Sequence, residues 1–186
     1  MGNPTVTGSA SDLLLKSRLE GLGYDVALMD DNAIDRTAAD SGDLIVVSES
    51  VKSNLIGTRF NSTTTPLIAL EAFVYDDLHL TPTGNTVGYG ITSGIDLKQG
   101  SATVDVYNRA NKIGWGDVTD DAMVLATLPG DTNKATAFAY GVGDTLANGS
   151  TSRNNWGGFF AHNDGVDNLT PAGWQLFEQV VNQVTA

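Results

Sequence analysis

The feature of this sequence that most constrains its fold is a set of short runs that are apolar at nearly every position. A strand of this kind is buried on both faces, which occurs mainly in parallel sheets covered by helices. The runs therefore predict a doubly wound, mainly parallel α/β sheet of the flavodoxin-like type. They are Asp25–Met29, Leu44–Ser48, Leu67–Leu70 and Trp156–Ala161.

Helical patterns separate these runs. A first helix is capped by Ser9 or Ser11, carries Leu15 and Leu19 at helical spacing and stops at Gly23. Thr170 followed by Pro171 predicts the start of a last helix. Two weaker helices are expected at Ala33–Ala39 and Val51–Phe60. Alternation of strands and helices is what a doubly wound sheet requires.

The middle of the chain has a different pattern, with short β-type runs divided by Gly, Asn and Asp turns. It predicts an antiparallel β extension of the parallel sheet. The chain shows no internal repeat and no long linker, so residues 1–186 are expected to form a single domain. The β-type runs are Gly88–Ile91, Ala102–Tyr107, Met123–Thr127 and Ala135–Tyr140.

The order of the predicted elements leaves the first strand of the sheet missing. An α/β sheet usually begins with a strand, whereas this chain begins at a turn, Gly2–Thr5, that should follow one. An empty position in a parallel sheet leaves backbone donors and acceptors open and invites addition of a strand from a partner, including a second copy of the chain. The alternative is a sheet that simply starts at Asp25.

Composition excludes several classes of partner. The chain has 22 acidic and 10 basic residues, a net charge of −12, so nucleic acid and anionic membrane surfaces are not expected partners. No apolar run approaches the roughly 20 residues of a membrane span, so no membrane insertion is expected. Abundant Asn, Thr, Gly, Ser and Asp, with few Lys and Glu, favour an extracellular or cell-surface protein.

Two polar residues stand where parallel strands end. Glu71 follows the run Leu67–Leu70, and His162 follows Trp156–Ala161. With the tail Thr170–Trp174, this pattern resembles class I glutamine amidotransferase-like domains, and the trehalose-utilisation branch most of all. The resemblance implies that Glu71 occupies the position of the catalytic Cys, and His162 that of its activating base.

The chain contains no cysteine, which excludes thiol catalysis and therefore glutamine amidotransferase activity. Glu71 could instead act as a general acid or base, with Asp76, Asp77 and His162 completing a polar cluster, and carboxylate pairs of this kind serve glycoside hydrolysis. The alternative is that Glu71 and the Asp76–Asp77 pair only cap backbone amides around the turn. Trp115 and Tyr75 are candidates for stacking against sugars, with Trp115 expected to be exposed between two glycines.

No complete metal or cofactor motif is present. His162, Asp164 and Asp167 could bind a metal ion together with Glu71, but their spacing matches no specific motif. The Asp-rich turn after His162 also leaves a structural calcium ion open as an alternative, although it lacks the closing Glu of a calcium loop. We therefore expect no cofactor.

The function expected from these observations is a non-catalytic structural or interaction module of an exported or cell-surface protein. It could assemble with itself, as a homo-oligomer or filament, by strand complementation. The alternative is a carbohydrate-binding or carbohydrate-active domain that uses a cleft at Glu71 and His162 to bind a glycan.

Overall fold

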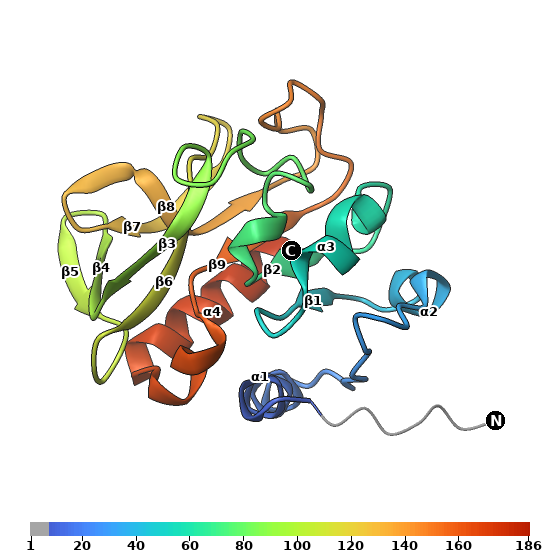
Figure 1. Ribbon diagram of the computed structural model, residues 1–186, viewed down its shortest axis with the longest axis horizontal. Coiled ribbons are helices and arrows are strands. Elements are labelled where there is room, and N and C mark those ends of the chain that lie inside the picture. The colour runs from blue at the N-terminus through green and yellow to red at the C-terminus, as the bar shows by residue number, and fades with distance from the viewer. Residues whose placement is uncertain (1–7) are drawn as a thin grey trace.

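The computed structural model describes residues 8–186 and shows an α/β protein built on one mixed sheet of nine strands (Figure 1). The turn expected at Gly2–Thr5, and the strand expected before it, lie outside the described residues. The main path through the sheet runs β1-β2-β9-β8-β7-β4-β5, while β3 pairs with β6 and β6 also touches β8. Among residues 8–186, no helix is both long and apolar enough to cross a membrane.

The described chain contains four α-helices, three 3-10 helices and nine strands. The α-helices are α1 (Ala10–Gly21), α2 (Arg36–Asp40), α3 (Ser53–Ile56) and α4 (Pro171–Val184), and the 3-10 helices are η1 (Gly57–Phe60), η2 (Ala72–Val74) and η3 (Asn163–Asn168). The strands are β1 (Ile45–Val47), β2 (Leu67–Ala69), β3 (Tyr89–Gly94), β4 (Asp96–Gln99), β5 (Ala102–Asp105), β6 (Asn111–Gly116), β7 (Met123–Leu128), β8 (Asp131–Tyr140) and β9 (Trp156–Phe159).

The prediction of a mainly parallel sheet is wrong in its proportions. Among the strands of residues 8–186, only the pairs β1–β2 and β2–β9 are parallel, and the other strand pairs are antiparallel. The reason is the short connections in the middle of the chain, because hairpin turns can join only antiparallel neighbours. At the turn between β7 and β8, for example, Gly130 adopts a φ of +81°. The predicted antiparallel extension thus forms the larger part of the sheet.

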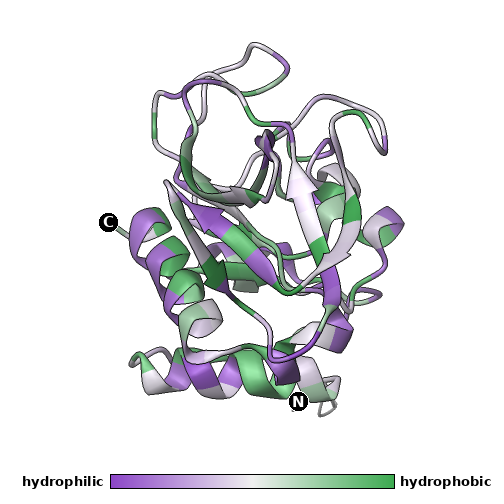
Figure 2. Cartoon of the chain, turned by 90° about the vertical axis from the view of Figure 1, so that its left-hand side faces the viewer, coloured by the Kyte–Doolittle hydropathy of each residue, from purple (hydrophilic) through white to green (hydrophobic). Residues whose placement is uncertain are grey.

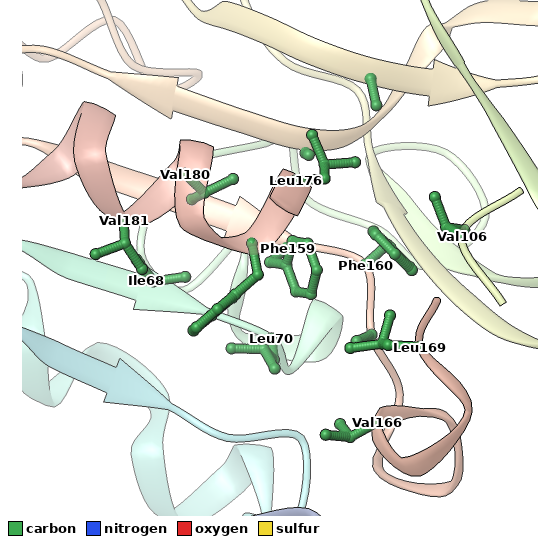
Figure 3. Close-up of a cluster of buried hydrophobic side chains, with 14 of the residues drawn as sticks. Ile68, Leu70, Val106, Phe159, Phe160, Val166, Leu169, Leu176, Val180 and Val181 are labelled. Carbon is green, nitrogen blue, oxygen red and sulfur yellow. The ribbon is translucent and has the colours of Figure 1, made fainter. Parts of the chain in front are cut away.

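The parallel part of the sheet separates two hydrophobic cores. Alternate residues of β2 point to opposite faces, so Ile68 packs in one core and Leu67 and Ala69 in the other. On the first face α4 covers β2 and β9, with Phe177 and Val181 fully buried (Figure 3). Figure 2 shows hydrophobic residues on both the helices and the strands. Continuous apolar sequence therefore reflects burial on both faces, as predicted.

Capping side chains set the ends of the two long helices as the sequence predicted. Ser9 is the N-cap of α1, where its hydroxyl accepts from the Asp12 amide at 3.2 Å and the Asp12 carboxylate accepts from the Ser9 amide at 2.7 Å. At the other end Gly23 has a φ of +99°. The hydroxyl of Thr170 accepts from the Gly173 amide at 3.0 Å and starts α4.

One predicted strand does not form. Asp25–Met29 pairs with no other strand in the described part of the chain. Its exposure alternates as in a strand, since Val26 and Leu28 are partly buried while Asp25, Ala27 and Met29 are exposed. The segment has the sequence and alternation of a strand but lacks a hydrogen-bonded neighbour.

The close approach of β9 to β8 generates a prediction about stability. A Cβ added at Gly158 would lie 2.4 Å from Phe138 Cζ and 3.0 Å from the Tyr75 hydroxyl oxygen. Gly158→Ala should therefore lower the free energy of unfolding by about 1–3 kcal/mol through overpacking. Gly21→Ala is the matched control, because nothing lies within 4 Å of its added Cβ, and it should raise stability by up to about 1 kcal/mol. Urea unfolding measures both; equal effects would contradict the packing described here.

Candidate functional site

Three ionisable side chains lie just beyond the carboxyl ends of neighbouring parallel strands. Glu49 follows β1, Glu71 follows β2 and His162 follows β9. Because these strands are adjacent and parallel, their carboxyl ends meet at one edge of the sheet, where α/β proteins usually bind ligands. The predicted partners Glu71 and His162 are thus brought to the same edge, together with Glu49.

Glu49 makes the closest contact in this cluster. Its Oε1 lies 2.6 Å from Nε2 of His162, and its Oε2 accepts from the Asn163 amide at 2.7 Å. The other ring nitrogen of His162, Nδ1, accepts from the Asp164 amide at 3.4 Å, which makes His162 the N-cap of η3. Sequence reasoning missed Glu49, although its position after an apolar run is the same signal that identified Glu71.

Burial shifts the pKa values of this pair in opposite directions. Desolvation raises the pKa of Glu49 to about 7, with the nearby Glu71 adding to the rise and the Asn163 amide opposing it. Burial also lowers the pKa of His162, an effect that Lys112 strengthens and Asp164 opposes. Burial thus favours the uncharged form of each group.

Glu71 caps a turn, as the alternative interpretation of its role predicted. Its Oε1 accepts from the Phe73 amide at 2.9 Å and begins η2, while burial raises the pKa of its carboxyl. Asp76 likewise accepts from the Asp77 amide at 3.0 Å. Within residues 8–186, no hydrogen bond or ion pair connects Asp76 or Asp77 to the Glu49–His162 pair.

The aromatic candidates are buried. Trp115 is 5% exposed, with the Lys134 Nζ 4.7 Å from its ring centroid, so the expectation that it is exposed is wrong. Gly90 on the paired strand instead lets its ring pack closely, because a Cβ there would lie 2.7 Å from the ring. Tyr75 is fully buried and stacks edge-on with Phe138. Neither side chain presents a face on which a sugar could stack.

No metal site is assembled in the part of the chain that the structure describes, since residues 8–186 hold no group of three or more His, Asp or Glu side chains placed to bind an ion. The Asp-rich turn that raised the possibility of calcium forms the 3-10 helix η3. In it, His162 Nδ1 lies 3.9 Å from a carboxylate oxygen of Asp164.

A second feature is a cavity of about 800 Å³ beside β1, which we call the β1 slot. It is lined by β1, by Tyr24–Met29, by α1 and by Ile56 of α3. A volume of this size is in the range of ligand pockets and far exceeds the single-water voids of a packed interior. Apolar side chains dominate its walls: Leu15, Leu19, Val26, Leu28, Leu44, Val46, Ile56, Phe60 and Val181.

The slot borders an open sheet edge. Ile45 donates its amide to the Pro66 carbonyl at 2.8 Å, and the Val47 carbonyl accepts from the Leu70 amide at 2.8 Å. A strand in a parallel pair uses alternate residues for one neighbour, so the amide and carbonyl of Val46 point away from β2, into the slot. Within the described residues β1 has no partner on that side.

The segment across the slot runs in the same direction as β1. It starts after the carboxyl end of α1, and Asp31 at its far end accepts from the Lys52 amide, beyond the carboxyl end of β1, at 2.8 Å. The amino end of α1 is tied to this same end of β1, since Asp12 accepts from the hydroxyls of Ser48 and Ser50. The slot therefore lies between two extended stretches that are parallel to each other.

Comparisons with known proteins identify no function. No family model matches the chain, and no solved structure matches it. In sequence it is similar to a UPF0284 protein of Halobacterium salinarum, with 26% identity over 171 residues that cover 83% of this chain and 50% of the relative. The chain thus spans about half the length of that curated relative. The name of the relative states no reaction, ligand or partner.

The raised pKa of Glu49 predicts how stability depends on pH. The folded pKa of about 7 exceeds the ordinary glutamate pKa of 4.5, so this group stabilises the fold fully below pH 4.5, and the contribution is lost as pH rises through about 7. We expect the free energy of unfolding to fall by on the order of 1–2 kcal/mol over this range. This is less than the full pKa shift would give, because solvent partly screens the carboxyl of Glu49.

Glu49→Gln should remove this pH dependence of stability, because the side-chain amide of glutamine does not titrate. Glu20→Gln is the control, since it removes the exposed carboxyl that pairs with Lys16 on α1. Urea unfolding at pH 5 and pH 8 measures the difference. A Glu49→Gln variant that keeps the full dependence of the natural protein would contradict the assignment.

Proposed function

We propose that this domain is a non-catalytic interaction module that takes up an additional β-strand in the β1 slot. The observation that carries the proposal is the open edge of β1 facing a cavity of about 800 Å³ with apolar walls. A strand taken up in the slot would provide hydrogen-bond partners for the amide and the carbonyl of Val46. It would also remove the apolar walls of the slot from water. This mode of recognition is strand addition to a sheet edge.

The sequence of β1 supports the proposal. Leu44–Val47 is apolar at every position, a composition typical of an interior strand rather than an edge strand. Edge strands are normally protected by charge, proline or a covering element, and an open apolar edge favours pairing with another chain. Leu44 and Val46 remain partly exposed, whereas the neighbouring strand β2 is completely buried.

We further propose that the sheet is a flavodoxin-like or amidotransferase-like one in which the slot takes the place of the first strand. In that arrangement the first strand lies between the second and the third. Asp25–Met29 and β1 would then be the second and third strands, which fits their parallel course on either side of the slot. The exported or cell-surface setting is part of the same proposal and depends on composition alone.

A second candidate function is favoured by the Glu49–His162 pair. A carboxyl with a pKa of about 7 beside an imidazole suits general acid–base chemistry, and a carbohydrate-directed site at Glu71 and His162 is the form that we propose. The capping role of Glu71 and the burial of Trp115 and Tyr75 make it the weaker candidate.

Strand uptake can be tested with proline at two neighbouring positions of β1. Val46→Pro removes an amide that faces the slot, so the fold should persist, as judged by circular dichroism, while strand uptake is lost. Val47→Pro is the matched comparison, because it places the proline ring on the side bonded to β2 and should destabilise the sheet by about 3 kcal/mol or more.

A phage-displayed library of random peptides supplies the binding measurement. Peptides selected on the natural protein should fail to bind the Val46→Pro variant. The proposal is wrong if no peptide distinguishes the two proteins.

The carbohydrate candidate predicts binding on a glycan array by the natural protein and its loss in Glu49→Gln and Glu71→Gln. Asp77→Asn serves as the control, since Asp77 makes no hydrogen bond to the pair in the described structure. Absence of binding to any glycan, or equal binding by all four proteins, would eliminate this candidate.

A further inference from the structure

We propose that the strand taken up in the β1 slot is a segment of a partner polypeptide with about five consecutive apolar residues, flanked by basic residues and running parallel to β1. This inference depends on the proposed function, because it specifies the partner of the same site. It follows from the walls of the slot, from the direction of its two sides and from the charges at its two ends.

Both faces of the slot are apolar. On one face lie Leu15 and Leu19 of α1 and Val181 of α4. On the other face lie Ile56 of α3 and Phe60 of η1, which belong to the second core. Side chains of a strand alternate between the two faces, so every position of the incoming segment meets apolar atoms. An amphipathic strand would bury its polar side chains without hydrogen-bond partners.

The direction follows from the neighbours. β1, β2 and β9 form a parallel ladder, and Asp25–Met29 runs the same way on the far side of the slot. A parallel strand continues this ladder without a change in hydrogen-bond pattern. The amino end of the segment would then lie near Asp43, where β1 begins, and its carboxyl end near Ser48.

Acidic side chains stand at both ends of the slot. Asp25 and Asp43 lie where its two sides begin, and Asp12 and Asp31 lie where they end. Lys16 is the basic residue of the lining, and its Nζ already contacts the Val26 carbonyl and, at 2.7 Å, a carboxylate oxygen of Glu20. With the chain at a net charge of −12, basic residues on either side of the apolar segment are complementary to the slot.

No described segment of a second copy fits as the occupant. Within residues 8–186 the continuous apolar runs Leu44–Val47, Leu67–Leu70 and Trp156–Ala161 are already committed to the sheet or its cores. Pairing of two β1 edges is blocked as well, because Tyr24–Met29 covers the far side of the slot. The slot accommodates one inserted strand rather than the edge of another sheet.

Three synthetic peptides test the inference. The first has five alternating valines and isoleucines between pairs of lysines, the second has serine at every other apolar position, and the third carries glutamates in place of the lysines. Titration calorimetry should show the first binding at least tenfold more tightly than the other two, with high salt reducing its advantage over the third. Val46→Pro should lose binding of the first peptide.

Spin labels on the first peptide determine its direction. A label at the carboxyl end should broaden the amide resonances of Ser48 and Ser50, and a label at the amino end those of Asp43 and Leu44. The inference is overturned if the two labels broaden the opposite sets of resonances. It is also overturned if the serine or the glutamate peptide binds as tightly as the first peptide, or if Val46→Pro binds the first peptide as well as the natural protein does. Self-association of the peptide-free protein that Val46→Pro abolishes would also overturn it, in favour of a second copy.

Failure of the inference can be told apart from failure of the proposed function. If displayed peptides bind in a Val46-dependent way but have an alternating or acidic pattern, strand uptake stands and the inference is wrong. If neither the displayed nor the synthetic peptides bind in a Val46-dependent way, the proposed function itself fails.

Discussion

The parallel pairing of β2 with β9 is the constraint on which the rest of the structure depends. It aligns Leu67–Ala69 with Trp156–Gly158, two segments far apart in the sequence, and joins the parallel ladder to the antiparallel strands through β8. The pairing is possible because Gly157 and Gly158 let β9 pass close to Phe138 and Val180. It divides the interior into two cores, and it brings Glu71 and His162 to one edge of the sheet.

The same ladder ends abruptly at β1. Glu49 and His162 secure the carboxyl end of β1 against η3, and Asp12 ties the amino end of α1 to Ser48. These polar contacts hold α1 and β1 on two sides of a cavity that no described segment fills. The slot is therefore preformed, with polar contacts at its ends and apolar side chains along its walls. An incoming strand would bury apolar surface there without the cost of ordering the residues that line the slot. This arrangement is why we favour strand uptake over acid–base chemistry at Glu49.

Sequence reasoning identified what depends on local pattern. Continuous apolar runs predicted β1, β2 and β9, with Glu71 and His162 following two of them. It missed β4 and β6, because Asn111–Gly116 contains two glycines and a lysine and becomes a strand only by pairing with β3. It placed a strand at Asp25–Met29, where β propensity is present but no described segment pairs with it. Trp115 was misjudged because its burial depends on Gly90, which lies on another strand.

The backbone of Val46 faces a position in the sheet that no described segment fills. Amide hydrogen exchange of the free protein, followed residue by residue by NMR, is the measurement that tests this arrangement, since Val46 and Ile45 differ in which side of β1 their amides face. We expect rapid exchange at Val46 beside slow exchange at Ile45. Equal, strong protection of both amides would show that this edge of β1 is already paired and that the slot is not open.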